Sequence, residues 1–211
     1  MRNFLEALRI QRWDDHRYYH HSLVNQSLHF VSALSFCLAY LLMFKDPAMA
    51  AVIGWLISML SRQAGHFFFE PRDYDYVNQA TDEYKEAIKV GYNIKRKIVL
   101  MSIWAASPLL VWYSPTLFGL LPSPQGLVQW LRQIGYVWLV VGVGGLIFRV
   151  CQLCLTRGVR TGLVWAAKII TDPFHDLRMY WKSPYRLLRR GIQGGSLIID
   201  DDEDVAEVPQ H

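Results

Sequence analysis

Hydrophobic and polar positions alternate along this chain in long blocks. Four apolar runs, at about residues 28–44, 48–64, 98–121 and 134–155, contain almost no charge. Each is close to the length of about 20 residues, within a range of about 17 to 25, that a helix needs to cross a bilayer. The pattern predicts an all-α protein, an integral membrane bundle of about four transmembrane helices, with residues 1–199 forming one membrane-embedded domain.

The segments between and after the apolar runs are polar or amphipathic. Residues 1–17 and 157–170 place apolar side chains at helical spacing, and part of 70–97 does so too, which predicts cytoplasmic amphipathic helices on the bundle surface. Asp172 followed by Pro173 is typical of an N-cap and a first helical position, and predicts that a short helix begins there. The acidic residues 200–211 are predicted to be a disordered tail.

Composition supports a membrane protein. The chain is 52% hydrophobic and 19% charged, and it has eight Trp. Its net charge of +4 comes from basic residues that flank the apolar runs, which fits anionic lipid headgroups and excludes a nucleic-acid partner. Cys37, Cys151 and Cys154 all lie inside apolar runs, so we expect free thiols. The N-terminus has no apolar core of a signal peptide.

The distribution of Lys and Arg predicts the orientation. Basic residues are concentrated before the first apolar run, in residues 70–97, and after residue 155, whereas the other two loops carry only Lys45 and Arg132. Because loops rich in Lys and Arg stay in the cytoplasm, both termini are predicted to be cytoplasmic. We therefore expect a multi-pass protein of the inner membrane in a bacterium or of the endoplasmic reticulum in a eukaryote.

Histidines are concentrated in two short stretches that adjoin apolar runs. These are YHHSLVNQSLH at 19–29 and GHFFFE at 65–70. A hairpin of the first two predicted spans would bring both stretches to one membrane face, where polar groups are costly unless they are used. The stretches contain the four predicted metal ligands, His20, His21, His29 and His66. His16 and His175 fall on the same side and are possible additional ligands or positioning groups.

Two further polar residues belong to this predicted catalytic site. Glu70 lies one helical turn after His66, and Asn25 lies one turn before His29, where it could hold the His29 ring by a hydrogen bond. Nitrogen ligands with an added carboxylate and open positions suit non-haem Fe(II), with Zn as the main competitor. Eight helical residues rise about 12 Å, so His21 and His29 share one metal only if the helix breaks near Ser22. Otherwise only one of them is a ligand.

Arg149 is the unusual residue of the fourth apolar run, about two helical turns from its end. Its guanidinium could extend to the headgroups, or it could bind the carboxylate of a lipid substrate. Both interpretations remain open at the level of sequence.

The two histidine stretches also resemble the 2-hydroxy fatty acid dioxygenase family, whose yeast member acts in α-oxidation at the endoplasmic reticulum. The resemblance covers roughly residues 15–75, and the matching residues are Tyr19, His20, His21, Asn25, His29, Gly65, His66 and Glu70. It implies an integral membrane enzyme that depends on Fe(II). Such an enzyme uses O₂ to convert a 2-hydroxy fatty acid into an acid one carbon shorter, so fatty acid, O₂ and membrane lipids are the expected partners.

Two other function classes compete with this hypothesis. A diiron lipid hydroxylase or desaturase would need about eight or more histidines in paired boxes, whereas this chain has seven in total. A non-catalytic scaffold or lipid-binding protein would use the basic cytoplasmic face and carry no metal. The metal content of the purified protein separates the three, and the oligomeric state is not predicted.

Overall fold

The computed structural model describes residues 3–70, 74–76, 78–92 and 94–193. Over these residues the chain is helical and contains no named β-strand, which confirms the predicted all-α class. The predicted acidic tail, 200–211, lies outside the described residues.

A π-helical segment, η1, lies between α3 and α4, and the longest connections are residues 69–81 and 114–126. The bounds of the helices are α1 Phe4–Tyr19, α2 Leu23–Met43, α3 Pro47–Ile53, η1 Gly54–Met59, α4 Leu60–Phe68, α5 Asp82–Ile88, α6 Ile94–Tyr113, α7 Leu127–Arg157, α8 Val159–Tyr180 and α9 Ser183–Gln193.

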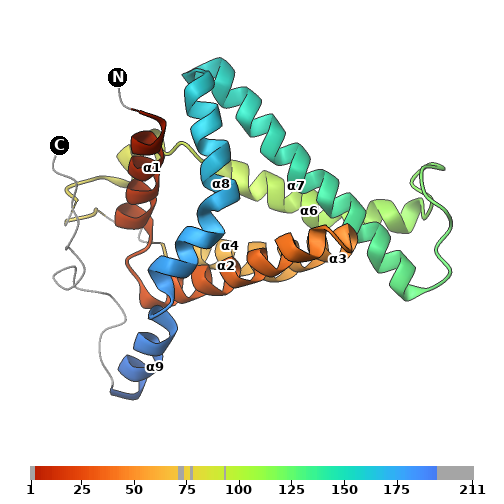
Figure 1. The fold of residues 1–211 in the computed structure, drawn as a ribbon, viewed down its shortest axis with the longest axis horizontal. Helices are drawn as coiled ribbons and strands as arrows, with labels where there is room; N and C mark the ends of the chain where they lie inside the picture. The colour runs from red at the N-terminus through yellow and green to blue at the C-terminus, as the bar shows by residue number, and fades with distance from the viewer. Residues whose placement is uncertain (1–2, 71–73, 77, 93, 194–211) are drawn as a thin grey trace.

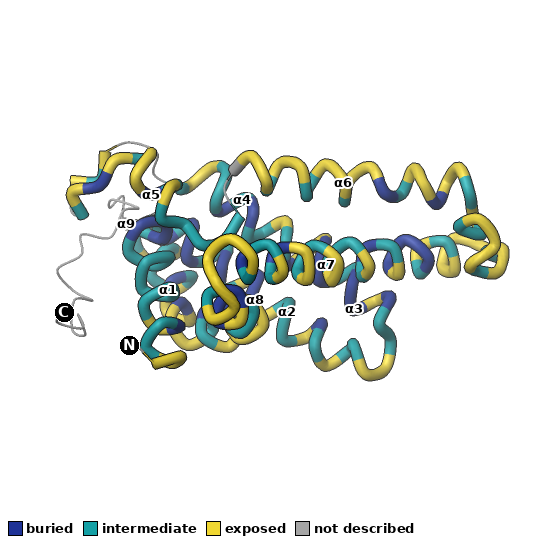
Figure 2. The backbone as a smooth tube through the Cα atoms, turned by 90° about the horizontal axis from the view of Figure 1, so that it is seen from above, coloured by how far each residue is buried: buried dark blue, intermediate teal, exposed yellow. Residues whose placement is uncertain are grey.

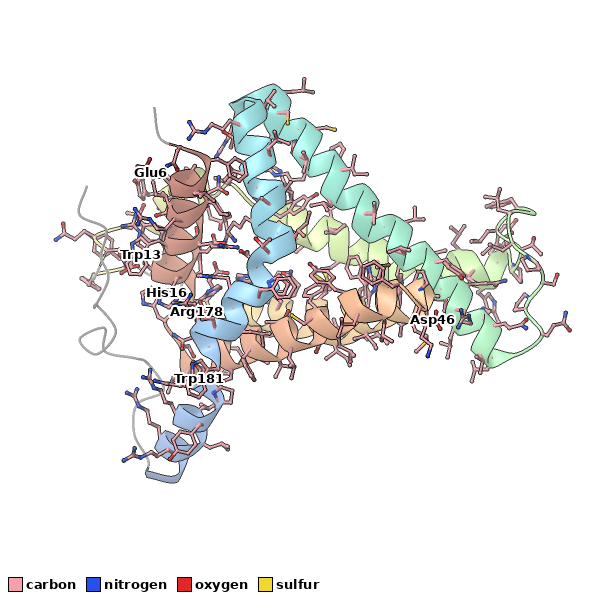
Figure 3. The ribbon with its side chains drawn as sticks, in the orientation of Figure 1. Glu6, Trp13, His16, Asp46, Arg178 and Trp181 are labelled. Carbon is pink, nitrogen blue, oxygen red and sulfur yellow. The ribbon has the colours of Figure 1, made fainter. Side chains whose placement is uncertain are left out.

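The long helices outline a triangle in Figure 1. The base is α2 lying against the rod of α3, η1 and α4, and the other two sides are α7 and α8. Helix α1 packs beside α8, and α9 packs on α2. His16 and Arg178 lie at one end of the molecule and Asp46 at the other in Figure 3, so the histidine-rich end is opposite the α2–α3 turn.

The helix does break near Ser22, which is one of the two alternatives that the sequence left open. Helix α1 ends at Tyr19, and α2 starts after Ser22, whose hydroxyl accepts a hydrogen bond from the backbone N–H of Val24 at 3.2 Å. His20 and His21 form the corner between the two helices. His20 is therefore free of the helical spacing that would hold it far from His29.

The second predicted span, 48–64, forms one continuous rod from Pro47 to Phe68 with π-helical η1 in its middle. Asp46 caps the start, since its carboxylate accepts from the N–H of Met49 at 3.2 Å, and Pro47 occupies the first helical position. The rod runs back along α2, which produces the predicted hairpin.

The third predicted span, 98–121, is helical only in its first part. Helix α6 ends at Tyr113 and turns occupy 115–120, which agrees with the kinked or broken end expected from the prolines inside this apolar run. Ser114 precedes Pro115, which disfavours helical geometry at Ser114. Leu117 and Phe118 then adopt positive φ angles of 46° and 59°, which a helix does not contain.

A correction concerns Asp172 and Pro173. They do not begin a new helix, because α8 runs through both of them from Val159 to Tyr180. The carboxylate of Asp172 lies close to Lys168 Nζ (2.5 Å) and Arg12 Nε (3.2 Å), so it forms ion pairs and does not cap a helix. Tertiary partners have replaced the local role that the Asp-Pro pair suggested.

Three tryptophans, one each from η1, α6 and α7, lie at the centre of the main hydrophobic core. Trp55, Trp104 and Trp138 stack in series, with ring centroids 5.6 Å and 5.3 Å apart. Trp55 Nε1 donates to the carbonyl of Trp138 at 2.8 Å, and Trp138 Nε1 donates to Ser107 Oγ at 2.9 Å. This core holds α6 and α7 on the α3–η1 rod and closes the triangle away from the histidines.

Figure 2 shows long exposed stretches on α6 and α7. Many of the exposed side chains on these helices and on α2 are large and apolar. Exposed large apolar side chains include Leu34, Leu38, Leu41, Ile103, Leu109, Val140 and Ile147. By length and composition, two helices of the described chain, α2 and α7, are apolar enough to cross a membrane.

Candidate metal centre

Three of the predicted ligands converge. His20 from the α1–α2 corner, His29 from α2 and His66 from α4 place one ligating atom each within 4.8 Å of one another. The ring centroids of His20 and His29 are 4.0 Å apart, and that of His66 is 4.9 Å from His29 and 5.6 Å from His20. His20 and His29 are buried, and His66 is partly buried.

A close helix contact brings His29 and His66 together. A Cβ atom on Gly65 would lie 2.1 Å from Asn25 Oδ1 and 3.4 Å from the Cδ2 atom of His29. Any side chain at position 65 would therefore push α4 away from α2. The glycine of the sequence stretch GHFFFE has a packing role directly beside the histidine that follows it.

The corner that carries His20 is held by two amides from the first turn of α2. Asn25 Nδ2 donates to the carbonyl of Tyr19 at 2.7 Å, and Gln26 Nε2 donates to the carbonyl of His20 at 2.9 Å. The expected bond from Asn25 to the His29 ring is absent, because neither ring nitrogen of His29 has a hydrogen-bond partner in the described chain. Asn25 instead positions the backbone at His20 and packs against Gly65.

Each of the three rings has a polar group facing its Nδ1 atom. His66 Nδ1 is 3.1 Å from Glu70 Oε2, His20 Nδ1 is 2.7 Å from the hydroxyl of Tyr180, and His29 Nδ1 is 3.6 Å from Asp176 Oδ2. A ring that directs Nδ1–H towards an acceptor keeps the lone pair of Nε2 for a metal. The buried Nε2 atoms of His20 and His29 have no hydrogen-bond partner in the part of the chain that the structure describes.

The electrostatic surroundings favour neutral imidazoles. Burial, followed by the nearby His29, holds the pKa of His20 well below its usual value. Burial, followed by the charge of Lys97, does the same to the pKa of His66. A neutral imidazole is the form that binds a metal. At neutral pH, His20 and His66 are therefore already neutral and can bind a metal ion without first losing a proton.

Three nitrogens with open positions opposite them are typical of a catalytic metal site, because structural sites use four protein ligands. Metal–nitrogen bonds of about 2.0–2.1 Å bring ligand atoms to within about 4.2 Å of one another. The observed limit of 4.8 Å is slightly wider, and small rotations of the side chains close the difference. The donor set fits Fe(II) or Zn; the carboxylates of Glu70 and Asp176 lie behind the rings as their partners.

A network of charged side chains from α1, α4 and α8 lies next to the histidine cluster. Arg62 NH1 of α4 lies 3.2 Å from Asp176 Oδ2, and its NH2 lies 3.7 Å from Asp172 Oδ2. Lys168 Nζ is 2.5 Å from both Asp172 and Asp15. Although burial alone would raise it, the charge of Arg62 lowers the pKa of Asp176 to about 2. Asp176 therefore stays ionised, and its carboxylate can attract a protonated Nδ1 atom of His29, which lies 3.6 Å away.

Three predicted histidines do not join the cluster. His16 bonds through Nδ1 to the Tyr180 hydroxyl at 2.9 Å, so it lies behind His20 as a positioning group. The Nε2 atom of His21 faces Asp75 Oδ2 at 3.7 Å. His175 is half-buried on α8 and is not part of the three-histidine group among the described residues.

Arg149 also lies away from the histidines. It is buried, and its guanidinium donates to the carbonyls of Val90 and Gly91 at 2.6 Å and 3.0 Å and to Gln152 Oε1 at 2.6 Å. These contacts fasten the segment before α6 onto α7. The main partners of Arg149 are therefore protein groups, and neither lipid headgroups nor a bound carboxylate.

Arg149→Leu is therefore expected to act on stability. It leaves two partly buried carbonyls, those of Val90 and Gly91, without donors, at a cost of up to about 1–3 kcal/mol for each unsatisfied group. The midpoint of thermal unfolding in detergent should fall, and the relative binding of a fatty acid and its methyl ester should not change. A selective loss of the acid would instead restore the predicted substrate role.

A cavity of about 380 Å³ lies beside the cluster, with His66 in its wall. Its other lining residues come from α1, α2, the α3–η1–α4 rod, the segment 88–92, α6, α7 and α8. Apolar side chains such as Phe36, Met43, Trp55 and Leu139 form most of the surface. This size and lining are typical of a site for an apolar small molecule.

Sequence reasoning missed three residues that complete the site, Arg62, Asp176 and Tyr180. Asp176 and Tyr180 are one turn apart on α8, a helix that contacts both α1 and α2. The available signal was the placement of Asp172, Asp176 and Tyr180 at intervals of four, which puts them on one helix face. Arg62, a charge within the second apolar run, was a second signal.

The fold and this site thus define an all-helical protein with a cluster of three histidines beside an apolar cavity. Comparison with known proteins adds no family: no family model matches the chain, and no curated protein or solved structure matches it.

Proposed function

We propose that this protein is a membrane-bound, Fe(II)-dependent dioxygenase that shortens 2-hydroxy fatty acids or related lipids by one carbon. The observation that carries the proposal is the convergence of His20, His29 and His66 beside an apolar cavity. The resemblance of the two histidine stretches to 2-hydroxy fatty acid dioxygenases selects this reaction among those that such a site supports.

The proposal includes a four-span membrane bundle. It is supported by the apolar surfaces on α2, α6 and α7, and by basic residues gathered in the segments at the histidine-rich end. Large exposed apolar surfaces are rare on soluble monomers and are ordinary on helices that face lipid. The site then lies at the cytoplasmic face, within reach of a fatty acid whose chain remains in the bilayer.

The residues have distinct roles in this proposal. His20, His29 and His66 would hold the metal, while Tyr180, Asp176 and Glu70 orient their rings. A bound Fe(II) would supply the centre at which O₂ is activated. The cavity excludes water from the acyl chain and leads it towards His66.

The overall reaction is balanced without a further reductant. A 2-hydroxy acid and O₂ yield the acid one carbon shorter, CO₂ and water, so every electron that O₂ accepts comes from the substrate. A diiron hydroxylase or desaturase needs electrons from a separate donor, which gives a clear distinction between the two.

The test begins with protein extracted from membranes in mild detergent. We expect one iron per chain, consumption of O₂ with 2-hydroxyhexadecanoic acid, and release of pentadecanoic acid and CO₂ without added reductant. Protein purified in the same way and treated with a chelator of Fe(II) is the control, and it should be inactive until iron is restored.

Other metal contents would contradict the proposal. Zinc in place of iron with no consumption of O₂ would identify a different reaction at the same histidines. Two irons per chain would favour the diiron alternative, and absence of metal would favour the scaffold or lipid-binding alternative.

A further inference from the structure

Among the described residues, four cationic side chains line the cavity beside His66, and three of them are neutralised by carboxylates. Lys89 lies 3.0 Å from Glu70 and 3.3 Å from Glu86. Arg62 is paired with Asp172 and Asp176. Lys168 is paired with Asp15 and Asp172. These ion pairs connect helices of the protein and leave little capacity for an external anion.

Lys97 is the fourth cation, and it differs from the others. Within the described part of the chain it has no hydrogen bond or ion pair. It lies near the start of α6, and Leu100 and Met101, three and four residues later, line the same cavity. The same face of α6 therefore carries the ammonium group of Lys97 and, one helical turn later, apolar side chains.

Lys97 also lies near the histidine cluster. It lines the main cavity together with His66, and both line a smaller adjoining cavity of about 220 Å³ as well. The charge of Lys97 is, after burial, the largest influence that lowers the pKa of His66. Burial, followed by the like charge of Lys89, lowers the pKa of Lys97 itself to about 7, although the negative charges of Glu70 and Asp15 oppose the shift.

We propose that Lys97 binds the carboxylate of a long-chain fatty acid whose tail occupies the apolar part of the cavity between α2, the α3–η1–α4 rod and α7. This inference rests on the proposed function and assigns the substrate's head and tail. With the carboxylate on Lys97, the adjacent carbon, which carries the 2-hydroxyl group, lies next to His66. The apolar wall formed by Phe36, Met43 and Leu139 receives the chain.

This assignment replaces the carboxylate role that the sequence suggested for Arg149. Arg149 is occupied by backbone carbonyls, whereas Lys97 is available. An ammonium group and a carboxylate form a charge-assisted hydrogen bond, and a methyl ester cannot supply the charge. Preference for the acid over its ester is therefore the property that reports on Lys97.

The experiment measures binding under argon, so that no O₂-dependent turnover occurs. The full-length protein in detergent is titrated with cis-parinaric acid, whose fluorescence is excited by energy transfer from Trp55 and Trp138 in the cavity wall. The probe is displaced with 2-hydroxyhexadecanoic acid or its methyl ester. Lys97→Met should weaken binding of the acid by about 10- to 100-fold and leave binding of the ester within about twofold.

Two variants complete the design. Lys97→Arg keeps the positive charge and should retain most of the preference for the acid. Lys95→Met removes an exposed cation of the same helix and should change neither ligand. Equal weakening of acid and ester by Lys97→Met, or no effect on either, would overturn the proposal.

Because the measurement requires neither O₂ nor turnover, it is separable from the test of the enzyme. An acid preference that depends on Lys97 in a protein without iron would support the carboxylate site and contradict the dioxygenase. An active iron enzyme whose preference for the acid survives Lys97→Met would support the dioxygenase and contradict the carboxylate site at Lys97.

Discussion

His66→Ala should reduce the bound metal to background while the protein remains folded. The substitution removes one of three nitrogens that lie within 4.8 Å of one another, and two imidazoles on different elements cannot replace it. His66 is only partly buried, so water can fill the space that its ring leaves. Metal analysis of purified protein, with circular dichroism to verify helix content, measures the result. Turnover of 2-hydroxyhexadecanoic acid should be lost with the metal.

Matched histidine variants make this prediction specific. His175→Ala and His21→Ala should keep their metal, because those rings are outside the cluster. Glu70→Gln, Asp176→Asn and Tyr180→Phe alter only the groups behind the rings. Each should cost about 10- to 100-fold in metal affinity or activity. If His66→Ala kept full metal content, or His175→Ala lost it, the site would be wrong as described.

Gly65→Ala should have the second largest effect. The new Cβ would meet Asn25 Oδ1 at 2.1 Å, so α4 must move away from α2 at the point where His29 and His66 face each other. Overpacking of this kind costs about 1–3 kcal/mol in stability. The separation of the two helices should also weaken metal binding. Thermal unfolding and metal titration in detergent measure the two consequences.

A glycine in open space supplies the control. Gly144 of α7 has nothing within 4 Å of a Cβ built on it, so Gly144→Ala should be neutral or stabilise the helix by about 0.5–1 kcal/mol. In the double variant Gly65→Ala with Asn25→Ala, the clashing amide is removed, and part of the metal affinity should return. Equal effects of Gly65→Ala and Gly144→Ala would show that the α2–α4 contact does not control the site.

Local sequence patterns were sufficient for most of the helices and for the corner at the site. The apolar runs predicted α2, the rod that follows it and α7, because continuous apolar segments of this length form helices. Ser22 indicated a possible break, which the structure contains at the corner that carries His20, because N-capping depends on a few neighbouring residues. The apolar run extended beyond the end of α6, and Pro115 within the run was the local signal for that interruption. The local Asp-Pro pattern failed at Asp172, whose ion pairs replaced capping.

The sequence by itself determined that the protein is helical and that its histidines belong to the two ends of a hairpin that meet at one face. Only the tertiary structure decided which of them meet. His20, His29 and His66 do so because Gly65 allows α4 to approach α2 and because α8 places Asp176 and Tyr180 behind the rings. The same packing leaves His21 and His175 outside and gives Arg149 to the carbonyls before α6. Contacts between residues so far apart in the chain depend on how whole helices pack, and no short stretch of sequence contains that information.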